Sequence, residues 1–544
     1  MKKDWINISW IKKNRKNLGA VFAVLLLLLI IWAVTGIISR DQKEHSDQET
    51  FTSQEPETTQ GPEKESLEET VPLETLPEET PPTETQTEES RADKAQQTET
   101  KEPEQPYIEP EPPYEPPTLV VASDLHYQSH SITDFGKAYR DFIASSDGKL
   151  IQYLPELLDA FSEEVIQQRP NALILSGDIT MNGEKENHQE LSDKLAKIQE
   201  SGIQVLVIPG NHDINNPHAS YYFEDEKTKG QPITPEEFYE YYRNYGYDQA
   251  RSRDVHSLSY VYELDERYWM MMLDTCQYEP VNLVGGRLKE ETLSWMDGQL
   301  KEAKEAGVTV IPVGHHNLFP QSSLYTTDCA MDNYEEAAAL LEKWELPVYV
   351  SGHLHVQRLK KNSQLKLPEE RLGPGPRLSV IKQAEKEEEP YGIYEIISDS
   401  ISITPCQYGV MRWDEEGNLT YQTKLTDVSG WADRHGIDNG ELLDFENYSR
   451  QYIKELIARQ IEKKMDPVSW EFIDEMTSLY ADLYEDYYAG RVIDEKAVKD
   501  SVPWQLWVRL LPDSRQVREM RAMIGDSKTD NNYLYVPNVN AYKR

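Results

Sequence analysis

The sequence predicts an α/β domain that is preceded by a membrane-spanning helix and an acidic linker and followed by a small helical bundle. Between residues 118 and 420, short apolar runs rich in β-branched residues alternate with longer amphipathic segments, a pattern typical of buried strands and surface helices. An uncharged stretch of 21 residues lies near the N-terminus, and apolar residues recur at helical spacing after residue 421. The 544 residues also exceed one ordinary domain of about 100–200 residues.

Residues 18–38 are the predicted transmembrane helix, because the run carries no charge and can cross a hydrocarbon core of ~30 Å. Six lysines and arginines lie in residues 1–17, so the positive-inside rule places that basic segment in the cytoplasm and the rest of the chain outside. We therefore expect a single-pass protein of the cell membrane with an uncleaved signal anchor. The alternative is a cleaved signal peptide, whose apolar region usually spans only about 7–15 residues.

Residues 39–117 form the predicted linker, a disordered segment rich in Glu, Pro and Thr. Within it, residues 41–117 hold 23 acidic and five basic side chains and almost no clustered apolar residues. Proline disfavours helix and like charges repel one another, so we expect an extended, solvated spacer. Such a segment contributes neither to a core nor to a site. Tyr107 and Tyr114 among its prolines hint at the start of packing, and the folded part is expected to begin near Thr118.

The whole chain has a formal charge of −40, from 96 acidic and 56 basic side chains. Nucleic-acid polymers are not expected as partners, because binding their phosphates needs a basic surface. The three cysteines are Cys276, Cys329 and Cys406. Cysteines so few and so widely spaced exclude a disulfide framework and a thiolate metal cluster as organising features.

The α/β domain is predicted over residues 118–420. Its predicted strands are the apolar runs 119–122, 172–175, 205–208, 308–313 and 348–350, with a further pair around 391–403. Its predicted helices are 150–168, 184–200 and 288–306. Ligands of open α/β sheets bind beyond the carboxyl ends of the strands, so functional residues are expected there.

A polar cluster follows each of the first five predicted strands. The clusters are Asp124-Leu125-His126, Gly177-Asp178, Gly210-Asn211-His212-Asp213, Gly314-His315-His316 and Gly352-His353-Leu354-His355. One histidine at a strand end is usually structural, but five such ends in one domain favour a shared site. Imidazole and carboxylate without thiolate are typical of an octahedral or near-octahedral site for Mn, Fe or Zn. The glycine that opens four of the clusters permits a sharp turn that aims the ligands at a common centre.

The order D-x-H, G-D, G-N-H-D, G-H-H and G-H-x-H resembles the calcineurin-like metallophosphoesterase superfamily. The resemblance covers about residues 118–420 and implies a β-sandwich flanked by helices, with two divalent metal ions. It implies that one metal is held by Asp124, His126, Asp178 and His355. It implies that the other is held by Asp178, which bridges the two, and by Asn211, His315 and His353.

The same resemblance implies the catalytic roles. His212 is expected to be the general acid or a contact to the substrate phosphate, and Asp213 is expected to orient it. His316 is expected in the pocket without being a metal ligand. Purple acid phosphatases have a tyrosine at the position of Met181, so an Fe(III)–tyrosinate centre is not expected.

The predicted reaction is metal-dependent hydrolysis of a phosphate ester. Two cations roughly 3.5–4 Å apart lower the pKa of a bridging water, and the resulting hydroxide attacks phosphorus. The leaving oxygen needs a proton, which His212 can supply.

The substrate prediction favours phosphodiesters, with cyclic nucleotides first. Residues 177–183 read G-D-x-T-x-x-G, which resembles the cyclic-nucleotide phosphodiesterase branch, and His188 fits the same pattern. Asn182 and His188 are therefore expected in the substrate pocket. Residues 421–544 carry three apolar stripes at helical spacing, and the helical bundle that they predict resembles the C-terminal domain of bacterial enzymes of that branch.

Two alternatives stay open. A domain outside the membrane cannot degrade a cytoplasmic messenger, so extracellular nucleotides, envelope polymers or phospholipid head groups could be the esters. The second hypothesis is therefore a phosphomonoesterase or an envelope-polymer phosphoesterase. The third is a surface scaffold protein with a vestigial site, which the complete set of expected ligands disfavours.

Overall fold

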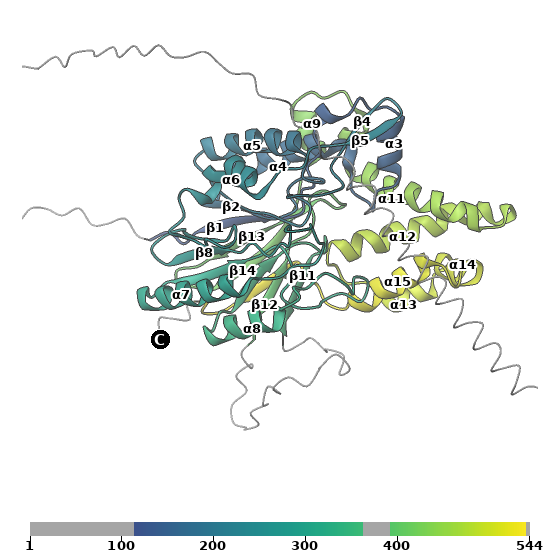
Figure 1. The fold of residues 1–544 in the computed structure, drawn as a ribbon. Coiled ribbons are helices and arrows are strands. Elements are labelled where there is room, and N and C mark those ends of the chain that lie inside the picture. The colour runs from purple at the N-terminus through teal and green to yellow at the C-terminus, as the bar shows by residue number, and fades with distance from the viewer. Residues whose placement is uncertain (1–113, 363–391, 540–544) are drawn as a thin grey trace, which may run out of the picture. The chain divides into compact units, whose positions relative to one another are not determined.

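The computed structural model describes residues 114–362 and 392–539. The predicted transmembrane segment and almost all of the predicted linker lie outside these residues. Within the described ranges, no helix combines the length and the apolar character that a membrane crossing requires. The described residues form two mixed β-sheets with helices around them and further helices toward the C-terminus (Figure 1).

In the described part of the chain, the first sheet has six strands. In spatial order they are β15 (Tyr533–Val536), β14 (Leu419–Leu425), β13 (Gln407–Trp413), β1 (Thr118–Ala122), β2 (Ala172–Ser176) and β3 (Gln204–Ile208). β1, β2 and β3 run parallel, whereas β13, β14 and β15 pair antiparallel. Every residue of β2 is buried, because parallel strands are covered on both faces.

The second sheet has seven strands over the same described residues. In spatial order they are β11 (Arg358–Lys361), β12 (Tyr394–Ile397), β10 (Val348–Ser351), β9 (Thr309–Val313), β8 (Tyr268–Met272), β7 (Tyr260–Glu263) and β6 (Ser252–Arg253). Side chains alternate along β8: Tyr268 and Met270 join the core that includes the first sheet, whereas Trp269 and Met271 join a separate core. The two sheets therefore enclose one core between them, as in a sandwich.

Helices cover the outer faces of both sheets. They are α3 (Lys137–Ala144), α4 (Leu154–Gln168), α5 (Lys185–Glu200), α6 (Pro235–Tyr242), α7 (Glu290–Ala306) and α8 (Tyr334–Lys343). Apolar residues of α4 and α5 belong to the core of the sandwich, and those of α7 and α8 form the separate core on the second sheet. Short elements complete the domain: η1 (His130–Ile132), η2 (Ile151–Tyr153), η3 (Arg243–Tyr247) and the hairpin of β4 (Ser220–Phe223) and β5 (Glu226–Lys229).

The first five predicted strands and the three predicted helices are confirmed to within a few residues. The strand pair expected around 391–403 is corrected, because its described part holds the single strand β12, which pairs with β11 and β10 instead. The strands β4, β5, β6, β7, β8, β11, β13, β14 and β15 were not expected. Most of them pair antiparallel and mix polar with apolar residues, which a search for apolar runs passes over. β8 is the exception, because it reads Tyr-Trp-Met-Met-Met and is buried throughout.

The C-terminal helices confirm the three apolar stripes, which fall on the third, fourth and sixth α-helices described beyond residue 426. The helices are α9 (Val428–Arg434), α10 (Gly440–Leu443), α11 (Phe445–Ile461), α12 (Ile473–Tyr488), α13 (Glu495–Asp500), α14 (Val502–Leu510) and α15 (Arg515–Asp526), with turns η6 (Glu462–Lys464) and η7 (Pro467–Phe472). The stripes lie on α11, α12 and α14, and Figure 1 shows these helices gathered at one end of the sheets. The boundary predicted at 420/421 is corrected, since it lies inside β14, and β15 returns to pair with that strand.

Candidate metal centre

The five polar clusters lie at the carboxyl ends of β1, β2, β3, β9 and β10, as predicted. β1, β2 and β3 are parallel within the first sheet, and β9 and β10 are parallel within the second. Parallel strands end at the same edge of a sheet, so each sheet gathers its clusters at one edge. Two groups of side chains that could each hold a metal ion result: Asp124, His126, Asp178 and His355 from both sheets, and His315, His316 and His353 from the second sheet.

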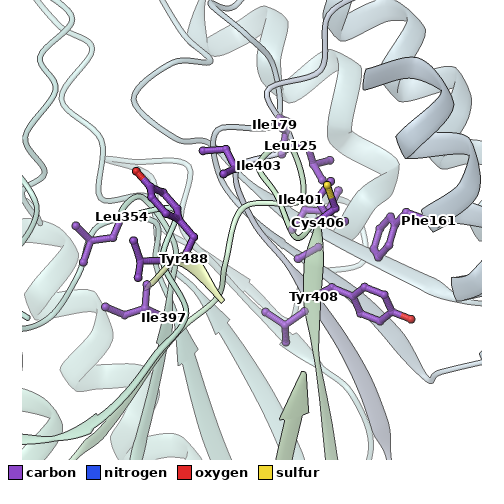
Figure 2. Close-up of a cluster of buried hydrophobic side chains, with 14 of the residues drawn as sticks. Leu125, Phe161, Ile179, Leu354, Ile397, Ile401, Ile403, Cys406, Tyr408 and Tyr488 are labelled. Atoms are coloured by element: carbon purple, nitrogen blue, oxygen red, sulfur yellow. The ribbon is translucent and has the colours of Figure 1, made fainter. Parts of the chain in front are cut away.

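Apolar residues between the ligands anchor the ligand loops. Leu125 separates the two ligands that follow β1, and Leu354 separates the two histidines that follow β10. Figure 2 shows both leucines, together with Ile179, among the buried side chains beneath the loops. Burial of these residues therefore fixes the direction in which the neighbouring ligands point.

The first group consists of Asp124, His126, Asp178 and His355, whose ligand atoms lie within 4.8 Å of one another. The Nε2 atoms of His126 and His355 are 3.0 Å apart. Nε2 of His355 is 3.3 Å from Oδ1 of Asp124, and Nε2 of His126 is 3.8 Å from Oδ2 of Asp178. These are the four residues expected for the first metal, and the structure brings them together.

The residues expected for the second metal also meet. Nε2 of His315 is 3.4 Å from Oδ2 of Asp178 and 3.2 Å from Oδ1 of Asn211. Nδ1 of His353 is 3.2 Å from the same His315 nitrogen. Oδ2 of Asp178 thus faces a histidine of each group, as a carboxylate shared by two cations must.

His316 lies beside the second group, but its ring nitrogens have other partners. Nδ1 is 2.8 Å from Oγ1 of Thr275, and Nε2 is 2.9 Å from the carbonyl oxygen of Val284. The ring is fully buried and lies 4.5 Å from that of His353, centroid to centroid. The ligand atoms of His315, His316 and His353 nevertheless lie within 4.8 Å of one another, so position alone does not separate His316 from the second group. The contacts of its two ring nitrogens are what set it apart.

The glycines that open the clusters serve close packing more than turning, which corrects their predicted role. Of the four, only Gly177 has a left-handed backbone, with φ 94°. A Cβ on Gly352 would lie 1.8 Å from Oγ of Ser123 and 2.6 Å from Oδ2 of Asp124. The absence of a side chain therefore lets loops from the two sheets approach each other.

Electrostatics at the centre link the buried carboxylates to the histidines. Burial opposes the charge on His315, but Asp178 and Asp124 outweigh it and raise the pKa of His315 to about 9. Burial also disfavours the Asp178 carboxylate, yet His315 and His212 hold the pKa of Asp178 well below its usual value. Burial and the charge of His315 lower the pKa of His353 to about 4.

His212 is placed at the open side of the centre. It is half-buried, its ring centroid is 4.9 Å from that of His126, and its backbone N–H donates to Oδ1 of Asp178 at 2.7 Å. Nδ1 lies 2.7 Å from the carbonyl oxygen of Met181 and 3.2 Å from Oδ1 of Asn182. The structure thus places Asn182 beside His212 and leaves Nε2 as the nitrogen without these contacts.

The expected orientation of His212 by Asp213 is corrected. The Asp213 carboxylate accepts hydrogen bonds from the backbone N–H groups of Gly210, Ile179 and Thr180, at 2.8, 3.2 and 2.9 Å. These contacts tie the loop after β3 to the loop after β2. The carbonyl of Met181 orients His212 instead, because a carboxylate engaged by three amides is directed away from the imidazole.

The expected place of His188 in the substrate pocket is also corrected. The side chain is fully buried, with Nε2 2.9 Å from the carbonyl oxygen of Asp213 and Nδ1 2.8 Å from the Tyr242 hydroxyl. A carbonyl only accepts, so Nε2–H donates and Nδ1 accepts from the tyrosine. Burial lowers the pKa of His188 to about 3, so the ring is neutral. It links α5 to the loop after β3 through its hydrogen bond to the Asp213 carbonyl.

Sequence reasoning missed the groups that hold the ligands in place. Nδ1 of His315 lies 2.9 Å from the carbonyl oxygen of Ser176, and Nε2 of His353 lies 2.8 Å from that of Asp328. The hydroxyl of Ser400 donates to the carbonyl of Asp124 at 2.7 Å. Most of these partners are backbone carbonyls, which every residue carries and no sequence pattern marks.

The donor set fits two divalent cations. Oδ1 of Asp124 is buried and makes no hydrogen bond to any residue that the structure describes. The facing Nε2 atoms of His126 and His355 can share only one proton at 3.0 Å. Carboxylate oxygens and imidazole nitrogens with unused lone pairs are ligands that Mn, Fe and Zn accept.

Two family models match the chain. Residues 117–357 match the calcineurin-like phosphoesterases, and residues 427–530 match the C-terminal domain of cyclic nucleotide phosphodiesterase. Over 243 residues the chain is 25% identical to the glycerophosphodiester phosphodiesterase GpdQ of Enterobacter lignolyticus (strain SCF1), a match that covers 44% of this chain and 70% of the relative.

Solved structures give weaker similarities. A dimetal phosphatase from Danio rerio has 13% identity and a TM-score of 0.39, with 57% of this chain and 97% of that chain covered. GAP50, the anchor in the inner membrane complex of Plasmodium, has 10% identity and a TM-score of 0.27, with 57% and 84% covered.

Proposed function

We infer that this chain, a dinuclear metal-dependent phosphoesterase with a calcineurin-like catalytic domain and a cyclic nucleotide phosphodiesterase C-terminal domain, acts on phosphodiesters outside the cytoplasm. One observation carries the chemistry. Asp178 belongs to the first ligand group, its Oδ2 also faces His315 of the second group, and the half-buried His212 lies beside them. Two cations and a proton donor together suit the hydrolysis of a phosphate ester.

The chain's own residues prepare the reaction as follows. Two divalent cations, when bound, activate a water molecule for attack on phosphorus and offset the charge of the phosphate oxygens. His212 keeps a proton on Nδ1 for the Met181 carbonyl, so Nε2 is the atom that can hold a proton for the departing oxygen. Asn182, 3.2 Å from the same Nδ1, fixes the ring from the other side.

Diester substrates are favoured over monoesters by the relatives. The named relative is a glycerophosphodiester phosphodiesterase, and the second family model belongs to cyclic nucleotide phosphodiesterases. We rank small or cyclic phosphodiesters first on this support. An envelope polymer or lipid head-group diester is the second candidate, because it would lie within reach of a membrane-anchored domain.

Membrane anchoring is part of the proposal and rests on the sequence. Residues 18–38 are uncharged and apolar, and the six basic residues before them favour a cytoplasmic N-terminus. The acidic segment 39–117 would then hold the catalytic domain outside at a flexible distance. Fractionation of cells, with protease added from outside, tests this placement: resistance of the catalytic domain to the protease in intact cells would contradict it.

A panel assay tests the activity. The chain from residue 107 onward, supplied with Mn²⁺, is assayed on bis(p-nitrophenyl) phosphate, p-nitrophenyl phosphate, glycerophosphodiesters and 2′,3′- and 3′,5′-cyclic nucleotides. We expect about two metal ions per chain by elemental analysis and faster turnover of the diester than of the monoester. Preference for the monoester would favour the phosphomonoesterase hypothesis. Absence of both bound metal and Mn²⁺ activation would favour the hypothesis of a scaffold protein with a vestigial site.

A further inference from the structure

Residues 321–329, part of the connection between β9 and α8, form a loop that two C-terminal helices hold. Asp526, the last residue of α15, accepts the backbone N–H of Ser323 on Oδ2 and the hydroxyl of Ser323 on Oδ1, both at 2.8 Å. The hydroxyl of Tyr325 is hydrogen-bonded to that of Tyr488 on α12. Hydrogen bonds to a carboxylate are stronger than those between neutral groups, so Asp526 is the main anchor of this end of the loop.

A chain of hydroxyl groups leads from the loop to the same carboxylate. Oγ of Ser322 accepts the backbone N–H groups of Leu324 and Tyr325, each at 3.0 Å. The hydrogen of the Ser322 hydroxyl is therefore left for the Tyr487 hydroxyl, 2.8 Å away. Tyr487 in turn donates to Oδ2 of Asp526 at 3.4 Å. The Asp526 carboxylate thus connects the loop with both α12 and α15.

The other end of the loop reaches the metal centre. The carbonyl oxygen of Asp328 lies 2.8 Å from Nε2 of His353. A carbonyl only accepts, so Nε2 carries the proton and Nδ1 keeps its lone pair. Nδ1 lies 3.2 Å from Nε2 of His315, among the ligands expected for the second metal. The loop therefore determines which nitrogen of His353 can bind that metal.

Burial does not hold the Asp328 carbonyl in place. Asp328 and the two threonines before it are exposed, and Asp328 has a left-handed backbone with φ 58°. A non-glycine residue in this conformation is strained and persists only where its surroundings fix it. After Asp328, the carbonyl of Cys329 accepts the backbone N–H of Asn317 at 3.1 Å. Before it, the hydrogen bonds to Asp526 supply the second anchor.

We propose that Asp526 is a positioning residue of the second metal site, because it holds the loop whose Asp328 carbonyl orients His353. This rests on the proposed function and gives the C-terminal helices a task in it. Over the ranges that the structure describes, the hydrogen bonds from residues 321–329 to metal ligands go to His353 alone. Binding of the second metal therefore depends on α15, whereas binding of the first metal does not.

Asp526→Ala in the full-length protein tests the proposal. Metal-free protein is titrated with Mn²⁺, and isothermal calorimetry gives the Kd of each site. We expect the Kd of the second Mn²⁺ to rise about 10-fold or more, the usual weight of a group that orients a ligand, and the first Kd to stay within twofold. In electron paramagnetic resonance, the signal of a coupled Mn²⁺ pair should give way to that of a single Mn²⁺. Asp526→Asn keeps an oxygen that can accept the Ser323 N–H and should recover part of the loss.

Asp482→Ala is the matched control, since it removes the same side chain from α12. Asp482 is exposed and accepts Nε–H of Arg450 at 3.0 Å, a contact between two C-terminal helices. Both Mn²⁺ constants should be unchanged in this variant. Urea unfolding of the two variants accompanies the titrations. A lower unfolding free energy in Asp526→Ala with an unchanged ratio of the two constants would show a merely structural role and overturn the proposal.

The remaining outcomes separate the positioning role from the proposed function. Wild-type protein that binds no Mn²⁺ would refute the dinuclear site and the function with it. Two Mn²⁺ in the wild type and a second Kd within twofold in Asp526→Ala would overturn the positioning role alone. Should Asp526→Ala fail to fold, Ser323→Ala removes one of the two Ser323 hydrogen bonds from an exposed position. Half the free energy of a 10-fold change is about threefold in the second Kd, and an unchanged Kd would again overturn the role.

Discussion

At the residue scale, each carboxylate of the metal centre uses one oxygen to accept a backbone hydrogen bond and leaves the other facing the metal-site histidines. Asp124 accepts the backbone N–H of His353 on Oδ2, at 2.9 Å, and Asp178 accepts that of His212 on Oδ1, at 2.7 Å. The other oxygen of each carboxylate faces the histidines. Five ligands also have left-handed φ values between 44° and 69°: Asp124, His126, Asp178, His353 and His355. Such strain costs about 1–3 kcal/mol at each residue and concentrates at functional sites.

Substitution of Asp178 and of His212 should separate metal binding from proton transfer. Asp178→Ala removes the oxygen that faces both groups, so metal content should fall from about two to one or none, and activity should disappear. His212→Ala should retain the metals and lose about 10²–10⁴-fold in turnover, the usual weight of a general acid. Elemental analysis and turnover on the same samples check both. Loss of metal from His212→Ala equal to that from Asp178→Ala would contradict the role given to His212.

His188 predicts a pH dependence of stability. The pKa of His188 is about 3 in the folded protein and 6.5 ordinarily. Between these values the unfolded chain binds a proton at His188 and the folded protein does not. The contribution of His188 to the unfolding free energy is fully present above pH 6.5 and is lost as pH falls toward 3, by about 1.4 kcal/mol per pH unit. Urea unfolding at pH 7.5, 6.5 and 5.5 should show a shallower decline in His188→Gln than in wild type.

The matched control for this measurement is His256→Gln, at an exposed position. It should leave the decline unchanged. If the unfolding free energy of His188→Gln and of wild type declined equally with falling pH, His188 would be protonated in the folded protein. The assignment of a neutral ring to His188 would then be wrong.

The ligands could be predicted from the sequence because a metal centre needs specific side chains at strand ends. Roles that depend on the direction in which a side chain points could not be predicted from the sequence. Asp213 follows His212 in sequence, yet its carboxylate turns to three backbone amides. His188 shares a motif with the site, yet burial removes it from the pocket. Adjacency along the chain does not fix which way a side chain points.

At the element scale, close approach of the loops after β1 and β10 makes Gly352 sensitive. Gly352→Ala would place a Cβ 1.8 Å from Ser123 and 2.6 Å from the Asp124 carboxylate, so one loop must move. We expect loss of metal and of at least about 1–3 kcal/mol of stability, as for overpacking. Urea unfolding and metal content measure the two effects.

Gly298→Ala is the control for that substitution. Gly298 lies exposed on α7, and an added Cβ would meet nothing within 4 Å. Alanine should favour the helix by about 0.5–1 kcal/mol and leave metal content unchanged. Equal behaviour of the two variants would show that the loops after β1 and β10 have more room than the structure gives them.

Several strands were predictable because burial makes them apolar, although β8, which is equally apolar and buried, was missed. β2 and β10 are buried throughout, and their apolar runs mark them in the sequence. β14 reads Leu-Thr-Tyr-Gln-Thr-Lys-Leu and is half exposed, so its continuation past residue 420 could not be seen as an apolar run. The domain boundary was misplaced for the same reason.

At the scale of the whole molecule, the C-terminal helices lie between two strands of the first sheet in the sequence. The chain leaves the sheet at β14, builds the helices and returns as β15 beside β14. Backbone contacts also join α12 to the metal loop, since the Gln357 N–H donates to the carbonyl of Tyr488 at 2.8 Å. Gln357 lies two residues after the ligand His355. The catalytic and C-terminal parts are therefore one folding unit, which a division at 420/421 would cut.

The last prediction concerns where the folded part begins. Sequence reasoning placed the start near residue 118 and named Tyr114 as a hint of earlier packing. The structure bears out that hint: the hydroxyl of Tyr114 donates to Asp265 at 2.9 Å, and the Arg267 guanidinium lies 3.6 Å from its ring centroid. A chain that starts at 118 loses both contacts, so it should unfold with about 1–2 kcal/mol less free energy than a chain that starts at 107. Urea unfolding of the two fragments measures this difference.

Turnover separates this effect from any role of the acidic segment in catalysis. Both fragments should match the full-length protein in detergent on small diesters, because Tyr114 packs beside β8 rather than at the metal ligands. Tyr114→Phe in the longer fragment keeps the ring over Arg267 and removes only the hydrogen bond, so its unfolding free energy should lie between the two. Equal stability of all three would mean that folding begins after residue 117, and a large loss of turnover in both fragments would mean that the segment before residue 107 contributes to the site.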